Sequence, residues 1–239
     1  MAGHSKWAKI KRDKGANDAK RGAIFTRIGK QIAIAARKGT DPSMNPALAL
    51  AIEKAKAANM PNSNIQRAID RVNDKNAAAL EEITYEAYGP GGAGLIIEAA
   101  TDNRNRTLPE IKTALVKNGG QIADSGSVMF QFMRRGVIRV DSTGEEALLT
   151  VLDAGAEDAN EEENEIIVYT NQKDLAKVRQ SIINAGLKVI EAELQYIANN
   201  EVEINDPEVA RKMIKLMDVL DEVDDIVNVY TNADITVEV

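Results

Sequence analysis

The sequence contains no cysteine and a single histidine, His4, among its 239 residues. Without cysteine, the chain can form no disulfide, no thiolate site for zinc or an iron–sulfur cluster, and no cysteine nucleophile. One histidine close to the amino terminus is a poor basis for a histidine-ligated metal site or a Ser–His–Asp triad. We therefore expect a protein that is not an enzyme, with no catalytic residue, metal, cofactor or small-molecule substrate.

Long hydrophobic runs are also missing. The longest apolar stretches, such as PALALAI at 46–52, fall far short of the roughly 18 residues that a membrane-spanning helix needs. No apolar segment follows Met1, so we expect no secretory signal. The first forty residues are basic and acid-poor, as a transit peptide is, but they contain little serine. We expect a cytoplasmic protein without a membrane partner.

Acidic residues are scarce at one end of the chain and abundant at the other. The formal charge is −7, but residues 1–78 hold 16 Lys and Arg against 6 Asp and Glu, and residues 141–239 hold 7 against 24. Residues 79–140 hold 7 of each sign, and residues 1–40 hold 11 basic against 2 acidic groups. This asymmetry predicts a nucleic-acid-binding amino-terminal end on an otherwise acidic molecule. The alternative is that these lysines only solvate an exposed helix.

The first 16 residues show no periodicity, and their cations surround the single tryptophan, Trp7. This pattern is typical of an arm that becomes ordered on a partner. Trp7 either stacks on a base or packs beneath the next helix. Packing is favoured, because a lone tryptophan is usually part of a core.

From about Asn17 the sequence acquires a helical period. Ile24, Ile28 and Ile32 fall four residues apart and predict the buried face of a helix that ends before Gly39. Cations fall on the opposite face at about 100° per residue, which predicts a row that binds phosphate. These cations are Arg27, Lys30, Arg37 and Lys38.

Two shorter helices follow. Asn45-Pro46 predicts the N-cap and first turn of a helix that ends before Pro61. Ser63 with Gln66 predicts a capping box for a third helix. The inward residues of that third helix are expected to be Ile65, Ala68, Ile69 and Val72. Residues 1–78 are therefore expected to form a small basic helical domain.

After Asn76 the pattern changes to strands and tight turns. Residues 85–103 (YEAYGPGGAGLIIEAATDN) predict two strands joined by a Gly-Pro-Gly-Gly turn. A phosphate-binding loop is the alternative for the glycines at 89–94. Such a loop leads through Gly-Lys-Ser/Thr into a helix, whereas these glycines lead into a strand, so the hairpin is favoured.

A strand–helix–strand plan then recurs. It is present at 95–122, with a helix through Ile111, Leu115 and Val116, and again at 166–194. Such units predict split βαβ, ferredoxin-like modules. The expected fold class is α+β in three domains, a helical one and two ferredoxin-like ones, one inserted in the other. The expected boundaries are 1–78, then 79–133 plus 202–239, with 134–201 inserted.

Two acidic runs are the best candidates for enzyme chemistry, because carboxylates can hold Mg²⁺ or act as acid and base. One is a loop-like run at 157–165, and the other lies at a helix end at 218–225. Neither has the spacing of a calcium loop or an accompanying glycine pattern. Solvated surface is therefore favoured over a metal site. A metal-dependent nuclease and a pure protein-interaction scaffold remain the alternatives of other classes.

The polar run at 102–107 lies between a strand and a helix expected to begin near Pro109. Arg104 and Arg106 either contact phosphate near the helix start, or the run is a plain connection in which Thr107 caps the helix. Both readings stay open. The full set of candidate nucleic-acid-binding side chains is Lys6, Trp7, Lys9, Lys11, Arg12, Lys14, Lys20, Arg21, Arg27, Lys30, Arg37, Lys38, Arg104 and Arg106.

Five motifs closely resemble the YebC/PmpR family, whose mitochondrial members activate cytochrome oxidase translation. They are GHSKWAKIKRDKGANDAKRGAIF at 3–25, MPNSNIQRAI at 60–69, YEAYGPGGAG at 85–94, TDNRNRT at 101–107 and GSVMFQF at 126–132. The resemblance spans essentially the whole chain and begins at Ala2, so we expect no transit peptide before it. The arm departs from the family at 11–13, where a wholly basic run is usual, and Asp13 is expected to weaken one phosphate contact. The family implies three domains, one helical and two α+β, and no catalytic residue.

The resemblance implies a role in gene expression. Bacterial members are commonly described as probable DNA-binding transcriptional regulators, while other findings for the family point to the ribosome, especially to translation through proline-rich stretches. The residues themselves lean to RNA, because no helix-turn-helix signature is present and a cationic arm suits a folded-RNA crevice. We expect a non-enzymatic DNA-binding regulator, with a ribosomal-RNA-binding translation factor as the alternative. The oligomeric state stays open.

Overall fold

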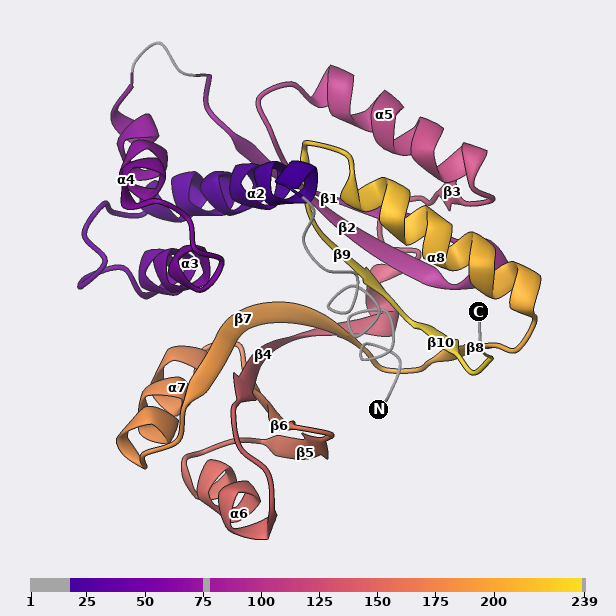
Figure 1. Cartoon of the computed structure of the whole chain (residues 1–239). Coiled ribbons are helices and arrows are strands. Elements are labelled where there is room, and N and C mark those ends of the chain that lie inside the picture. The colour runs from indigo at the N-terminus through magenta and orange to yellow at the C-terminus, as the bar shows by residue number, and fades with distance from the viewer. Residues whose placement is uncertain (1–17, 75–77, 238–239) are drawn as a thin grey trace.

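The computed structural model describes residues 18–74 and 78–237, with side chains described from Gly22 onward in the first helix. Within this part of the chain, the elements pack into a helical domain, a larger α+β domain and an α+β domain inserted into it (Figure 1). Each domain has its own hydrophobic core. No helix of the described residues is long and apolar enough to cross a membrane.

The helical domain packs its elements around a small apolar core. The elements are α2 (Asp18–Ala36), α3 (Pro46–Ala57), α4 (Asn62–Asp70) and the 3₁₀ turn η1 (Arg71–Asn73). Ile28 and Ile32 of α2 meet Leu48 of α3 and Ile65 of α4 in that core. The predicted cap of α3 is confirmed, because the side chain of Asn45 accepts from the backbone N–H of Leu48 at 3.2 Å.

Local predictions at the ends of these helices are wrong in three places. The capping box is absent, since α4 begins at Asn62 with no side-chain cap and Gln66 instead donates to Asp70 at 2.9 Å. Ile24 and Val72 were expected inside but are 37% and 38% exposed. Both lie toward the ends of the helical stretches, where an apolar face can extend beyond the neighbouring helix that covers it.

The larger α+β domain is a two-layer unit. Its antiparallel sheet has the order β3-β1-β2-β9, and α5 and α8 lie side by side over one face of it (Figure 1). The residues of these elements are β1 (Glu81–Tyr88), β2 (Gly94–Thr101), α5 (Arg104–Lys117), β3 (Gln121–Ile122), α8 (Pro207–Asp221) and β9 (Ile226–Thr231). Strands β8 (Val202–Ile204) and β10 (Ala233–Ile235) pair in parallel beside this layer.

The hairpin predicted at 85–103 is confirmed, and its strands run over 81–88 and 94–101, with Tyr88 opposite Gly94 across the turn. The turn is the 3₁₀ segment η2 (Pro90–Gly92), where Gly91 and Gly92 have φ of 76° and 78°. Positive φ is strained for residues that carry a Cβ, which explains why glycines occupy the turn. The glycines therefore shape the turn of a hairpin that leads into a strand, as the sequence favoured.

The inserted domain has the β-α-β-β-α-β order of a ferredoxin-like module. Its sheet order is β5-β6-β4-β7, and the elements are β4 (Phe132–Val140), α6 (Glu145–Asp153), β5 (Asp158–Glu162), β6 (Glu165–Asn171), α7 (Leu175–Asn184) and β7 (Val189–Ala198). Apolar residues of β4 and β6 pack against α6 and α7. The larger domain shares the two-layer plan, and its elements run β1-β2-α5-β3 before the insertion and β8-α8-β9-β10 after it.

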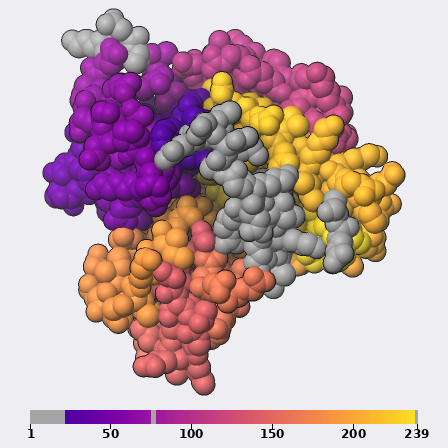
Figure 2. All heavy atoms as spheres, in the orientation of Figure 1, coloured from indigo at the N-terminus to yellow at the C-terminus, as the bar shows by residue number. Residues whose placement is uncertain are grey.

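The three domains enclose a cleft. Figure 2 shows the helical domain (purple) and the inserted domain (orange and red) as lobes beside the larger domain. A cavity of about 570 Å³ lies where they meet, lined by α2 and α3, by β1, β2 and β9, and by β7 and the start of α7.

Candidate nucleic-acid interface

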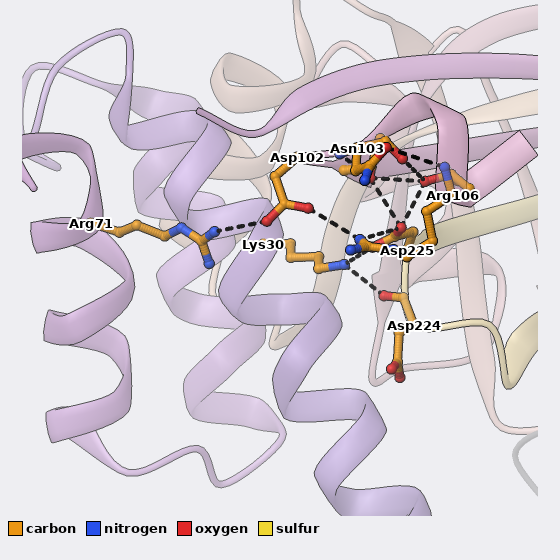
Figure 3. Close-up of polar contacts among 9 residues, drawn as sticks. Lys30, Arg71, Asp102, Asn103, Arg106, Asp224 and Asp225 are labelled. Atoms are coloured by element: carbon orange, nitrogen blue, oxygen red, sulfur yellow. Dashed lines mark hydrogen bonds and ion pairs between the residues drawn. The ribbon is translucent and has the colours of Figure 1, made fainter. Parts of the chain in front are cut away.

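Helix α2 directs two of the predicted phosphate-binding cations at the larger domain. Arg27 Nη1 lies 3.3 Å from Asp221 Oδ1, and its second terminal nitrogen donates to the Asp221 carbonyl oxygen. Lys30 Nζ donates to Asp225 Oδ1 at 2.6 Å and to the Asp224 carbonyl oxygen at 2.8 Å (Figure 3). Carboxylates of the larger domain thus cover Arg27 and Lys30 in this structure, and the predicted phosphate contacts of these two cations stay a prediction. The helical period gives the face of a residue and does not show what covers that face.

Asp225 is the centre of this contact and is almost fully buried. Its Oδ2 accepts from Arg106 Nη2 at 2.8 Å and from the hydroxyls of Thr107 at 2.7 Å and Thr101 at 3.0 Å. Burial alone would raise the pKa of this carboxyl. The bonds from Lys30, Thr107 and Arg106 outweigh it and hold the pKa of Asp225 well below its ordinary value. The prediction of a solvated acidic surface at 218–225 is wrong for Asp225.

The amino-terminal turn of α5 forms the other side of this centre. Asn103 is the N-cap and accepts from the Arg106 backbone N–H at 3.2 Å, so the helix begins at Arg104 and Pro109 lies inside it. The predicted start near Pro109 is therefore wrong, and so is the cap by Thr107 in the second of the two open readings. Thr107 is fully buried, and its hydroxyl points at Asp225 instead. The Asn103 side chain accepts a backbone N–H of the first turn, as Asn and Asp side chains commonly do at helix starts.

The two arginines of this turn differ in their surroundings. Arg106 bridges Asp225 and Asp102, the latter at 3.1 Å. Asp102 also lies 4.0 Å from Arg71 of the helical domain, which makes a second contact between the domains (Figure 3). Arg104 is more exposed and pairs with Glu81 of β1 at 2.5 Å. Both arginines thus have carboxylate partners within the protein.

The remaining candidates in α2 and just after it also differ in their surroundings. Arg37 donates to the Leu80 carbonyl oxygen at 2.7 Å, which ties the end of α2 to the segment before β1. Lys38 is exposed, lines the cavity and has no side-chain partner among the described residues. The side chains of Lys20 and Arg21 lie outside the described part of the chain. Six further candidates lie outside the described residues altogether: Lys6, Trp7, Lys9, Lys11, Arg12 and Lys14.

Other cations of the cavity were not predicted from the sequence. Arg134, at the start of β4, lies 5.6 Å from the ring centre of Tyr196, and Tyr196 meets Tyr230 edge to face with ring centres 5.4 Å apart. Lys54 and Lys173 line the same cavity. The Arg134-Arg135 doublet, one residue after the GSVMFQF motif, was an available signal, whereas a lone lysine in an amphipathic helix gives none.

A second set of ion pairs joins the helical domain to the inserted domain. Lys54 of α3 lies 3.4 Å from Glu191 and also pairs with Glu193 of β7, and Glu53 lies 2.5 Å from Arg179 of α7. Burial lowers the pKa of Lys54, but the two glutamates outweigh it and the net shift is upward. Charged contacts thus fix the helical domain on both sides.

The acidic run at 157–165 is structured. It forms the edge strand β5 and its turn into β6, so the prediction of a loop is wrong here. Arg135 lies 3.6 Å from Glu157 on this edge. The described residues contain no group of three or more His, Cys, Asp or Glu side chains placed to hold a metal ion. Charged residues at an edge strand hinder pairing with another sheet.

Two family models cover nearly the whole chain. Residues 5–75 match the TACO1/YebC protein N-terminal domain, and residues 80–233 match the TACO1/YebC second and third domain. A protein of Halothermothrix orenii named "Probable transcriptional regulatory protein" is 46% identical over 246 residues, which span 100% of this chain and 97% of the relative. A protein of the same name from Roseiflexus castenholzii is 48% identical over 248 residues, with the same shares covered.

A solved structure has the same fold. The crystal structure of a conserved hypothetical protein from Aquifex aeolicus superimposes with a TM-score of 0.86 at 39% identity, over 93% of each chain. This similarity extends over all three domains, because so large a share of both chains is covered.

Proposed function

The chain belongs to the TACO1/YebC family, and from that premise we propose that it is a non-enzymatic regulator of gene expression that binds nucleic acid through its basic amino-terminal end. One observation carries the proposal: residues 1–78 hold 16 basic against 6 acidic groups, while residues 141–239 hold 7 against 24. Attraction to phosphate is the main source of sequence-independent nucleic-acid affinity. The relatives named as transcriptional regulators agree with such a role.

The candidate cations differ in their contacts where the helical domain packs on the larger domain, and this supports different roles for them. Arg27 and Lys30 are engaged by Asp221 and Asp225, so first contact with nucleic acid falls to the arm and to Lys38. The arm candidates at 6–14 carry five positive charges within nine residues. Closely spaced cations can neutralise neighbouring phosphates of either DNA or RNA.

Ribosomal RNA is the second candidate target, alongside promoter DNA. A duplex reader places a helix in the major groove. Asp221 and Asp225 cover the face of α2 that carries Arg27 and Lys30, which disfavours insertion of that face into a groove, while a cationic arm can enter a folded-RNA crevice. The acidic inserted domain would then point away from RNA or toward basic proteins.

A salt titration tests the proposal. In the full chain, changing Lys9, Lys11, Arg12 and Lys14 together to Ala should weaken binding of a 20-base-pair duplex and of an RNA hairpin. The slope of log affinity against log salt should flatten by up to about 3.6 for the duplex, because each of the four phosphate contacts contributes about 0.9 to the slope for duplex DNA. A matched control changes four exposed cations of the acidic end to Ala: Lys177, Arg211, Lys212 and Lys215.

The control should leave the slope almost unchanged. Equal slopes for the two quadruple variants would refute a role for the arm. Crosslinking in cells followed by sequencing of the attached nucleic acid separates promoter DNA from ribosomal RNA, and the absence of either favours a protein scaffold. Incubation of the protein with labelled DNA and RNA plus Mg²⁺ should give no cleavage, whereas a protein-dependent cut would restore the nuclease alternative.

A further inference from the structure

We propose that the face of α2 that carries Arg27 and Lys30 is a phosphate-binding surface, and that the free protein covers it with its own carboxylates. The acidic turn, defined here as residues 221–225 between α8 and β9, is the covering element. Nucleic acid and the acidic turn would compete for the same cations, so binding would release the helical domain from the larger domain. This inference rests on the proposed function and adds to it a route of regulation.

The acidic turn presents to α2 the groups that a nucleic-acid backbone would present. Two carboxylates and two backbone carbonyl oxygens meet one guanidinium and one ammonium group. Lysine, arginine and hydroxyl donors are the side chains that bind phosphate oxygens in proteins. The turn is therefore a chemical substitute for two phosphates on these two cations.

The contact between α2 and the acidic turn can open without leaving a buried charge without hydrogen-bond partners. Asp225 is 2% exposed and needs partners in any folded state. When Lys30 leaves, Asp225 keeps the bonds from Thr101, Thr107 and Arg106, all of which come from its own domain. The Arg27–Asp221 pair lies at the margin, with both side chains 15% exposed. Separation of the helical domain from the acidic turn therefore exposes Arg27, Lys30 and Asp221, whose charges water or phosphate can solvate.

The rest of the domain contact is suited to release as well. The helical domain meets its neighbours through charged pairs such as Lys54–Glu191 and Glu53–Arg179, and through Arg37 on a backbone carbonyl. Leu50 of α3 adds an apolar contact with the core of the inserted domain. The cavity of about 570 Å³ at the same junction leaves this contact incompletely packed. Polar interfaces between domains of one chain permit relative motion. A polyanion that attracts α2 can therefore move the helical domain as a body.

Asp221→Asn is the first test, measured on the full chain with the same duplex and RNA hairpin as probes. This substitution removes the carboxylate charge that pairs with Arg27 and leaves every cation of the chain unchanged. Affinity should rise about two- to fivefold, as expected for loss of one partly exposed ion pair. Glu222→Gln is the matched control. It removes the same charge from the next residue, whose exposed carboxylate has no side-chain partner among the described residues.

Arg27→Gln is the second test, because competition predicts that its effect depends on Asp221. In the wild-type chain, Arg27→Gln removes the contact with Asp221 and also the expected phosphate contact. The two losses change affinity in opposite directions, so affinity should change less than twofold. In the Asp221→Asn chain it should lower affinity about three- to fivefold. A double-mutant cycle isolates this coupling. If Arg27 only held the domains together, Arg27→Gln would raise affinity as Asp221→Asn does.

Distance measurements give a third readout. The chain has no cysteine, so dyes can be placed at Lys56→Cys on α3 and Lys117→Cys on α5, both exposed. Saturating RNA hairpin should lower the energy-transfer efficiency between them. Unchanged efficiency together with equal affinities for Asp221→Asn and Glu222→Gln would overturn the competition while leaving nucleic-acid binding intact. A wild-type chain that binds neither probe would overturn the proposed function itself.

Discussion

Lys30 of α2 donates to the carboxylate of Asp225 at 2.6 Å across 195 positions of the chain. This bond joins the helical domain to the point where β2, α5 and β9 of the larger domain meet, since Thr101, Arg106 and Thr107 bind the same carboxylate. The buried carboxylate is stabilised most when all four donors bind it, and the three from the larger domain remain when Lys30 leaves. The stability of the larger domain and the position of α2 are therefore coupled through one residue.

Asp225→Asn should destabilise the protein by about 2–4 kcal/mol, because it leaves Lys30 and Arg106 near a group that no longer carries a charge. The pKa of Asp225 is held below its ordinary value. The carboxylate thus contributes stability that is complete above about pH 4 and is lost as the pH falls below that value. Urea unfolding between pH 3 and pH 7 should show a steeper loss at low pH in the wild type than in the variant.

Asp224→Asn is the control for this prediction, because the Asp224 side chain is exposed and only its carbonyl oxygen contacts Lys30. Its cost should stay within about 0.5 kcal/mol. Identical pH profiles for the wild type and Asp225→Asn would contradict the assigned role of the carboxylate.

Ionic strength should loosen the docking of the helical domain. The partly exposed pairs Arg27–Asp221 and Lys54–Glu191 are screened when the Debye length falls from about 10 Å at 0.1 M salt to about 3 Å at 1 M. The radius of gyration from small-angle X-ray scattering should increase over that range, while far-UV circular dichroism stays constant. A constant radius would show that apolar packing, and not charge, holds the domains together.

Much of the fold could be predicted from the sequence because its signals are local. The alternation of apolar residues and the Gly-Pro-Gly-Gly turn identify the β1–β2 hairpin, and Asn45-Pro46 identifies the start of α3. The β-α-β-β-α-β order of the inserted domain followed from the repeated strand–helix plan. Each of these features is determined by residues within a few turns or strands of one another.

The candidate site could be predicted only in part, because its partners are distant in the chain. The helical period correctly placed Arg27 and Lys30 away from the core of the helical domain. That Asp221 and Asp225 cover them depends on the packing of two domains, and a single sequence carries no local signal for such a pairing. The start of α5 was misplaced for a similar reason, since Thr107 suited a cap by residue type and its actual partner is Asp225.

Asn45→Ala should cost about 2–3 kcal/mol, more than the loss of an ordinary cap at about 1 kcal/mol. Asn45 is buried, and its side-chain nitrogen also donates to the carbonyl oxygens of Ala35 at 2.8 Å and Gly39 at 2.7 Å. The substitution therefore leaves the end of α2 and the start of α3 without partners. Asn45→Asp keeps the cap oxygen but loses both donated bonds, so thermal unfolding should place it between the wild type and Asn45→Ala. Equal stability of Asn45→Asp and the wild type would contradict the role of the two donated bonds.

Glu86→Gln tests a carboxylate that organises the segment carrying the GSVMFQF motif. Glu86 is buried, and its two oxygens accept backbone N–H groups from Gly126 at 2.5 Å and from Val128 and Met129 at 2.7 Å each. Burial raises the pKa of Glu86, but these three bonds outweigh it and the net shift is downward.

Glutamine replaces one acceptor oxygen of Glu86 with a donor that faces an N–H group. We therefore expect Glu86→Gln to cost about 2–3 kcal/mol, with faster hydrogen exchange at the amides of Val128 and Met129. Glu82→Gln, on the same strand at an exposed position, is the control and should change stability by less than about 0.5 kcal/mol. Because the folded pKa of Glu86 lies below its ordinary value, the difference between wild type and Glu86→Gln should shrink as the pH falls below about 4. A difference that stays constant from pH 7 to pH 3 would show that the shape of the side chain, and not its charge, holds this segment in place.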